Sequence, residues 1–155
     1  MTSTFKRDMP IGEKAEREFA SLLLTSRADI TSLTFNKNKD YDLKVSFLNG
    51  DVVTYEIKYD IRSSLTGNVA VETFSRGKQS GLYTSLADKW VYNIYVHSSR
   101  EHLWVEYSRE NLVKLLETQE FKVMNNAGDL GSGTNITLIP CDVFVRHCDA
   151  VLFKD

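Results

Sequence analysis

The sequence predicts an α/β or α+β fold, in which a central mixed β-sheet is flanked by helices. The first observation is the order of the predicted elements, which is a helix, several strands, a second helix, further strands and a last helix. Elements in such an order bury their apolar faces by packing helices on a sheet. The second is the length of 155 residues, which suits a single domain over 1–155. The third is the lack of an internal repeat or linker in the sequence.

The composition is that of a globular protein. Apolar residues make up 42% of the chain, and no apolar run approaches the ~18 residues of a membrane helix. The N-terminal residues contain no apolar signal segment, so we expect a cytoplasmic protein with no membrane partner. The net charge of −2 argues against a non-specific DNA coat, although a cluster of catalytic carboxylates would itself lower the charge. Cys141 and Cys148 suit one face of a helix better than a disulfide or a zinc site.

The segment 41–58 is predicted to form a β-hairpin. It contains two stretches of alternating apolar and polar residues, from Leu43 to Phe47 and from Val53 to Ile57, with a glycine turn between them. Side chains alternate between the two faces of a strand, and opposed residues of an antiparallel pair share a face. The two apolar sets therefore meet only if opposed residues have numbers whose sum is even.

The loop of this hairpin should contain an odd number of residues. The two-residue turn that Asn49-Gly50 favours would give an odd sum and set one apolar face against a polar one. We therefore predict a three-residue loop, with a type I turn followed by a left-handed Gly50. In this register Asp42 opposes Glu56, and a loop one register longer would oppose it to Lys58. The register places all three charged residues on one face.

The other elements follow from hydrophobic periodicity and from local start signals. Pro10 suits the first turn of the first helix, Ser108 suits the N-cap of the second, and Pro140 stands at the start of the last. Helices are predicted over 10–25, 109–118 and 141–153, with a short turn over 86–89, and strands outside the hairpin over 31–35, 69–74, 90–96, 102–107, 121–124 and 136–139.

The charged face of the hairpin fits the hydrolysis of a phosphodiester. This reaction needs neutralisation of the phosphate charge and an activated water, and a divalent cation supplies both. Magnesium prefers oxygen ligands and often takes only one or two carboxylates, which Asp42 and Glu56 would provide. Lys58 could orient the water or stabilise the transition state. An amphipathic hairpin with a solvated polar face and surface ion pairs would show the same spacing.

Basic residues near the hairpin are candidate contacts to a nucleic acid. Lys37 and Lys39 lie in a polar turn before the hairpin, and Arg76 and Lys78 lie in a Gly/Ser-rich segment in mid-chain. Loops of this kind often carry binding residues, and an ordinary surface connection has the same composition. Glu72 could face the site from the strand after Lys58, and a surface or structural glutamate is the simpler interpretation.

These residues resemble the PD-(D/E)XK nuclease superfamily, with a glutamate on the first helix, an acid at a strand start, a hairpin and then E-x-K. The resemblance implies a restriction-endonuclease-like core and Mg²⁺-dependent hydrolysis of DNA, in which Mn²⁺ can substitute. It implies that Asp42, Glu56 and the backbone carbonyl of Ile57 bind the metal. It further implies that Asp42, Glu56, Lys58 and Glu16 are the catalytic residues. By spacing alone, Glu16 lies at the margin of the apolar stripe and would be solvated.

Two positions qualify the match. Tyr41 stands where the family name places proline, at a position that varies widely. Asp40 competes with Asp42 as the acid, and we prefer Asp42 because an apolar residue follows it and its parity agrees with that of Glu56. The small size and the helical glutamate are most similar to Holliday-junction-resolvase-type or phage-encoded nucleases. That similarity implies branched repair or recombination intermediates as substrates, a homodimer, and a bacterial or phage-infected host cell.

Two other functions stay open at the level of the sequence. A catalytically inactive module with the same fold, which binds nucleic acid or protein, would also explain the near-neutral charge and the loose motif. A different hydrolase could use the same metal-binding face.

Overall fold

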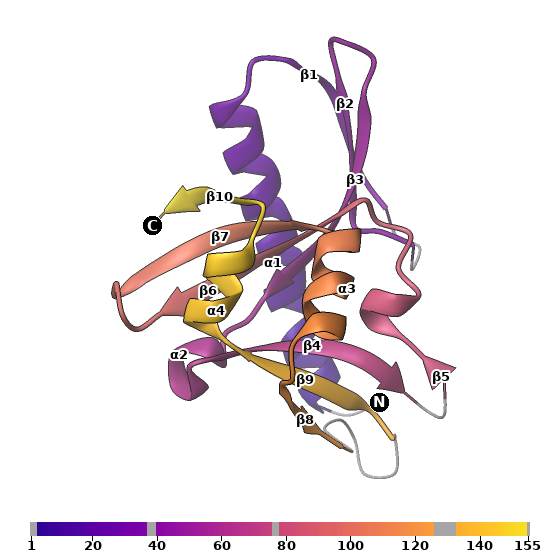
Figure 1. Ribbon diagram of the computed structural model, residues 1–155. Coiled ribbons are helices and arrows are strands. Elements are labelled where there is room, and N and C mark those ends of the chain that lie inside the picture. Colours follow the sequence, from indigo (N-terminus) through magenta and orange to yellow (C-terminus); the bar gives the residue numbers. More distant parts are fainter. Residues whose placement is uncertain (1–2, 37–39, 76–77, 126–132, 155) are drawn as a thin grey trace.

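Two sheets form the framework of the protein, a mixed α+β fold seen in a computed structural model that describes residues 3–36, 40–75, 78–125 and 133–154 (Figure 1). The larger sheet is six-stranded and contains, in order across it, β1 (Ile30–Phe35), β2 (Leu43–Phe47), β3 (Val52–Tyr59), β6 (Lys89–Val96), β7 (Glu101–Ser108) and β10 (Ala150–Lys154). The smaller is four-stranded, in the order β5 (Lys78–Gln79), β4 (Asn68–Ser75), β9 (Asn135–Pro140) and β8 (Lys122–Met124). Among the described strand pairs only β3–β6 is parallel. The predicted central mixed sheet is therefore present.

Helices and the smaller sheet cover the two faces of the larger sheet (Figure 1). The described helices are α1 (Ser3–Ser26), α2 (Ser63–Thr66), the 3₁₀ turn η1 (Gly81–Tyr83), α3 (Arg109–Thr118) and α4 (Cys141–His147). Helix α1 packs on one face, where the ring of the fully buried Phe19 lies 5.2 Å from those of Tyr55 and Trp104. On the other face β4, β9, α3 and α4 enclose a second core. The sheet therefore separates two apolar layers.

The β2–β3 hairpin has the predicted register. Leu43 pairs with Tyr55 and Val45 with Val53, so the two apolar sets lie together under α1. The N–H of Phe47 donates to the carbonyl of Asp51 (2.9 Å), and the residues between them form a three-residue loop. The last of these, Gly50, has a φ of 92°, in the left-handed region that glycine adopts without steric cost.

The prediction of a helix over 141–153 is correct only for its first half, because the second half forms a strand. Helix α4 ends at His147, and β10 then pairs antiparallel with β7 and forms the edge of the larger sheet. The N–H of Asp149 donates to the carbonyl of Glu106 (2.9 Å), and its carboxylate accepts bonds from the N–H of Ser108 and the side chain of Asn111. These bonds come from residues distant in sequence, and pairing the edge of β7 satisfies its backbone.

Two further details differ from the sequence-based prediction. The turn over 86–89 is not helical, because Asp88 and Thr54 exchange hydrogen bonds of 3.0 Å between side chain and backbone, and this fixes the chain as it enters β6. Helix α1 begins at Ser3, so Pro10 lies inside it instead of in its first turn. The residues before Pro10 include good helix formers such as Lys6 and Arg7, which extend the helix despite the missing N–H of proline.

The predicted cap of the second helix is present, and the expectation for the cysteines is met only in part. Ser108 caps α3 by accepting a hydrogen bond from the N–H of Asn111 (3.1 Å). Both cysteines are free thiols, but Cys148 follows the end of α4 in an extended conformation, so it does not share a helical face with the buried Cys141. Among the described helices, none is long and apolar enough to cross a membrane.

Replacing Phe19 by alanine should destabilise the protein strongly. The ring is fully buried between α1 and the sheet, and removing a buried phenylalanine costs about 3–5 kcal/mol. Urea denaturation followed by circular dichroism measures the loss. The matched control is Leu24→Ala on the same helix, where the side chain is 55% exposed and the change should stay within about 0.5 kcal/mol. Equal losses in the two variants would contradict the packing described for α1.

Candidate active site

Asp42 is hydrogen-bonded to β3, the strand that contains Glu56 and Lys58. It lies one residue beyond the last ladder pair of the hairpin, and its N–H donates to the carbonyl of Tyr55 (2.9 Å). Its carboxylate accepts a hydrogen bond from the N–H of Ile57 (2.7 Å). The side chain therefore replaces a backbone partner at the end of the hairpin, and this places the carboxylate beside Glu56.

Glu56 and Lys58 form an ion pair on the face of the sheet opposite α1. Lys58 Nζ lies 3.3 Å from Glu56 Oε1, and the glutamate side chain is 17% exposed while that of the lysine is 46% exposed. Trp90 is the neighbour of Glu56 across the parallel β3–β6 pair, and its ring centroid lies 5.6 Å from Lys58 Nζ. Burial raises the pKa of Glu56, and the charge of Asp42 adds to the rise while Lys58 opposes it.

Glu16 joins this pair of carboxylates from helix α1. Its pKa is raised to about 7, first by burial and then by the charge of Asp42, with which its carboxyl shares a hydrogen bond. The charges of Glu13 and Glu56 contribute further. The apolar stripe of α1 packs on β2 and β3, and Glu16 at its margin reaches the end of the hairpin. The structure thus brings together Glu16, Asp42, Glu56 and Lys58.

The chemistry of these donors suits a divalent cation. Magnesium is commonly held by one or two carboxylates, with water and phosphate completing its shell, and Asp42 and Glu56 lie on neighbouring strands. The mutual repulsion that raises the pKa of Glu16 is what a cation at this position would relieve. Within the described residues no group of three or more carboxylate, imidazole or thiol side chains is spaced as a ready metal cluster. Asp42 and Glu56 would supply the two carboxylates that such a cation commonly takes.

A cavity of about 490 Å³ lies beside the ion pair. Glu56 and Lys58 line it on one side, and Trp90 and Tyr92 of the neighbouring strand β6 also contribute. Glu72 of β4 lines it as well. Of the two interpretations that the sequence allowed for Glu72, the structure therefore favours a position facing the site. The sequence analysis did not assign Trp90 to the site, because its position beside Glu56 depends on the parallel β3–β6 pairing, which alternation within one strand does not reveal.

The remaining predicted residues separate into described and undescribed ones. Asp40 is exposed, whereas Asp42 is half-buried and bonded to β3, which supports the choice of Asp42. Lys78 is exposed on β5 and does not belong to the described lining of the cavity. The predicted nucleic-acid contacts that lie outside the described residues are Lys37, Lys39 and Arg76.

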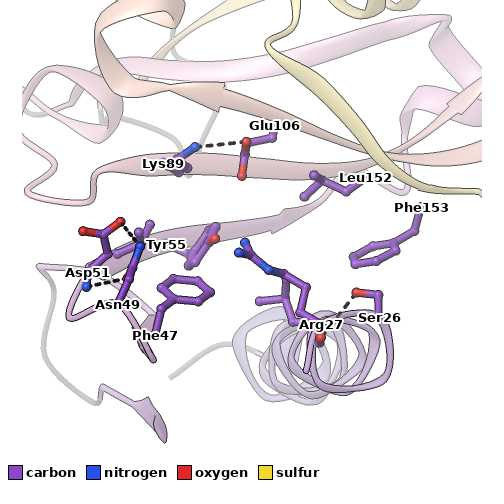
Figure 2. Close-up of a pocket in the computed structure, with 12 residues that line it drawn as sticks. Ser26, Arg27, Phe47, Asn49, Asp51, Tyr55, Lys89, Glu106, Leu152 and Phe153 are labelled. Carbon is purple, nitrogen blue, oxygen red and sulfur yellow. Dashed lines mark hydrogen bonds and ion pairs between the residues drawn. The ribbon is translucent and has the colours of Figure 1, made fainter. Parts of the chain in front are cut away.

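A second cavity, of about 400 Å³, lies on the α1 side of the sheet (Figure 2). Figure 2 shows Arg27 at the end of α1 beside the ring of Phe47, 4.4 Å from its centroid. Arg27 pairs with Asp29 (2.7 Å), and Lys89 Nζ pairs with Glu106 Oε2 (3.1 Å). These opposite charges balance one another, and none of the predicted site residues lines this cavity. We therefore place the candidate site on the other face.

No family model, curated protein or solved structure matched the chain. The functional assignment therefore depends on the residues and on their geometry.

The stability of the metal-free protein should fall as the pH rises from 5 to 8, and Glu16→Gln should reduce that fall. The pKa of Glu16 is about 7 in the folded protein against 4.5 as its ordinary value. The folded state therefore holds more protons between these values, and stability decreases as Glu16 ionises. Urea denaturation in EDTA at several pH values measures the difference between the variant and the wild type.

The matched control is Glu117→Gln, on the exposed face of α3. Its stability curve should run parallel to that of the wild type. Because Glu56 and Asp60 also have raised pKa values, the comparison uses the variant-minus-wild-type difference. If Glu16→Gln also runs parallel to the wild type, Glu16 does not lie against Asp42 as described.

Proposed function

We propose that the protein is a metal-dependent endonuclease that hydrolyses phosphodiester bonds in DNA. The observation that carries the proposal is the juxtaposition of Asp42 and Glu56 from adjacent strands, with Lys58 Nζ 3.3 Å from Glu56. The third carboxylate, Glu16, comes from a separate helix and meets the same place. The resemblance of these residues to the PD-(D/E)XK superfamily supports the same conclusion.

Each residue has a distinct task in this proposal. A bound Mg²⁺, or Mn²⁺ in its place, would neutralise phosphate charge and activate water. Asp42 and Glu56 would hold the cation, with the backbone carbonyl of Ile57 as a further ligand. Lys58 would stabilise the charge that develops on the phosphate, and the Trp90 ring beside it restricts where its ammonium can lie. Glu16 would add negative charge beside Asp42.

The site also suggests how its two carboxylates stay in place before any cation binds. Ile57 N–H holds one oxygen of Asp42 at 2.7 Å, and Lys58 holds Glu56 Oε1. A site whose groups are already oriented loses less entropy when the reaction begins. The ordered hairpin therefore supports a catalytic use of these side chains.

Substrate form, assembly and location belong to this proposal as well. The resemblance to junction-resolving and phage-type nucleases supports branched repair or recombination intermediates as substrates. A homodimer would allow paired cuts in such a junction. Cytoplasmic DNA of a bacterial or phage-infected cell would then be the target, with Lys37, Lys39, Arg76 and Lys78 as contacts to its phosphates.

The alternative is a module with the same fold that binds nucleic acid or protein without cutting. The observation that favours it is the Glu56–Lys58 ion pair, since a solvated polar face of a hairpin also forms such pairs. A binding module would be indifferent to the removal of either carboxylate as long as the fold persists. The two functions therefore separate on the variants that follow.

Cleavage of DNA should require a divalent cation and both carboxylates. Wild-type protein is incubated with labelled linear, branched and single-stranded DNA and RNA in Mg²⁺, Mn²⁺ or EDTA. Asp42→Asn and Glu56→Gln keep the shape of each side chain and remove its charge, so each should lower the rate by about a hundredfold or more. Glu117→Gln should cut at the wild-type rate. Metal-dependent cleavage that persists in both amide variants would refute the assignment, and no cleavage of any substrate would favour the binding module.

Magnesium should also stabilise the folded protein. A ligand that binds only the folded state at a hundred times its Kd adds about 2.7 kcal/mol, which raises the melting temperature. Differential scanning calorimetry at increasing Mg²⁺ should show this rise in the wild type and in Glu117→Gln. The double variant Asp42→Asn, Glu56→Gln should show almost none. A rise of equal size in the double variant would place the cation elsewhere.

A further inference from the structure

The cavity beside Lys58 has a second polar wall that the cleavage chemistry does not use. Glu72, on β4, is exposed to the cavity, and Ser80 Oγ donates a hydrogen bond to its Oε2 (2.9 Å). Among the described residues, no other side chain or backbone group donates a hydrogen bond to the Glu72 carboxylate. Ser80 therefore orients the carboxylate, and both oxygens can still accept from a ligand, because Oε2 keeps a second lone pair beside the one that Ser80 uses.

This wall is built firmly into the fold. Gly81 follows Ser80 with a φ of +55°, and a Cβ at Gly81 would lie 2.2 Å from the carbonyl oxygen of Glu72. Only glycine lets the chain approach the β4 backbone so closely. Arg109 donates to the carbonyls of Leu82 (3.0 Å) and Tyr83 (2.9 Å), which ties η1 to α3. The Glu72–Ser80 pair is thus fixed in position.

The rest of the cavity has a mixed apolar and polar lining. Ala70, Ile136 and Trp90 contribute apolar surface, while Lys58 lies on the side of the proposed cation. The volume of about 490 Å³ falls within the range of small-molecule sites. A nucleotide offers the matching chemistry, because its phosphate would lie toward Lys58 and its base toward the apolar surface and Glu72.

We propose that this cavity takes one unpaired nucleobase of the DNA substrate, with a preference for guanine, and that Glu72 reads its Watson–Crick edge. The proposal rests on the nuclease function proposed above. A carboxylate accepts hydrogen bonds and donates none. Guanine offers two adjacent donors, N1–H and the N2 amino group, so it can pair with the carboxylate through two bonds. Cytosine and adenine offer a donor beside an acceptor, and thymine offers N3–H between two carbonyls.

The proposal also defines the form of the substrate. Trp90 and Tyr92 form the β6 side of the cavity and are each 2% exposed, so a base would enter from the solvent side. Glu72 can bond to its Watson–Crick edge only if that edge is not already paired. A base inside a duplex cannot enter until it leaves the stack, which costs least where the strand is already unpaired. DNA with a single-stranded or junction nucleotide next to the cut is therefore preferred over continuous duplex.

Two measurements test the base preference. In EDTA, fluorescence anisotropy follows the binding of labelled oligothymidine strands that carry a single central guanine, adenine, cytosine or no replacement. In Mg²⁺, sequencing of the ends cut from a randomised single strand gives the base next to the cut. We expect the wild type to favour guanine over thymine about tenfold in both assays, since one good bidentate contact discriminates by roughly that much.

Variants assign the preference to the carboxylate. In Glu72→Gln the amide presents one donor and one acceptor, so guanine should lose its advantage and adenine or cytosine should gain. Ser80→Ala should weaken the preference without reversing it, because the carboxylate remains but loses its orienting bond. Glu117→Gln should behave as the wild type. Glu72 is a surface residue, so circular dichroism should show each variant folded.

The outcomes separate this proposal from the nuclease function. Equal binding and cutting of all four bases by the wild type, or the same guanine preference in Glu72→Gln, overturns the base pocket and leaves the nuclease function intact. Guanine-dependent binding that Glu72→Gln removes, in a protein that cuts no DNA, supports the base pocket and refutes the nuclease function.

Discussion

The register of the β2–β3 hairpin is the constraint on which the rest of the site depends. Side chains alternate across a strand, so a slip of β3 by one residue would turn Glu56 and Lys58 into the apolar layer beneath α1 and move Tyr55 and Ile57 out of it. Burial of that apolar layer forbids the slip, and the left-handed Gly50 sets the loop length that agrees with it. At the other end of the hairpin, Asp42 is bonded to the β3 backbone. The packing of the core thus places the charged side chains without being part of their chemistry.

The parallel pairing of β3 with β6 explains why the cavity has a second wall. A parallel connection needs a long crossover, and here the chain between the two strands contains α2, β4, β5 and η1. This crossover folds back over the same face, so that Glu72 of β4 lies across the cavity from Lys58. The requirement that β4 and β9 pair in a separate sheet holds that wall in place. One topological feature therefore produces both sides of the cavity.

The sequence predicts what local alternation and local caps determine, and fails where distant contacts decide. The hairpin register and the Ser108 cap follow from residues a few positions apart, and both are correct. The end of α4 depends on bonds from Asp149 to groups about forty residues earlier, which periodicity does not reveal. Glu16 is similar, because spacing places it at a solvated margin while the packing of α1 on the sheet brings it against Asp42. The cavity depends on the second sheet, for which the sequence contains no pairing signal.

The two faces of the larger sheet differ in how their charged side chains are paired. On the α1 side, Arg27 pairs with Asp29 and Lys89 with Glu106, so both basic side chains of that cavity have partners of opposite sign. On the other side, Lys58 pairs with Glu56, while Glu16 lies against Asp42 at the end of the hairpin, and burial together with repulsion raises the pKa of both glutamates. Such an arrangement costs folding stability that amides or apolar residues in the same places would not. Strain of this kind is typical of functional sites, and a divalent cation is the species whose binding would relieve it.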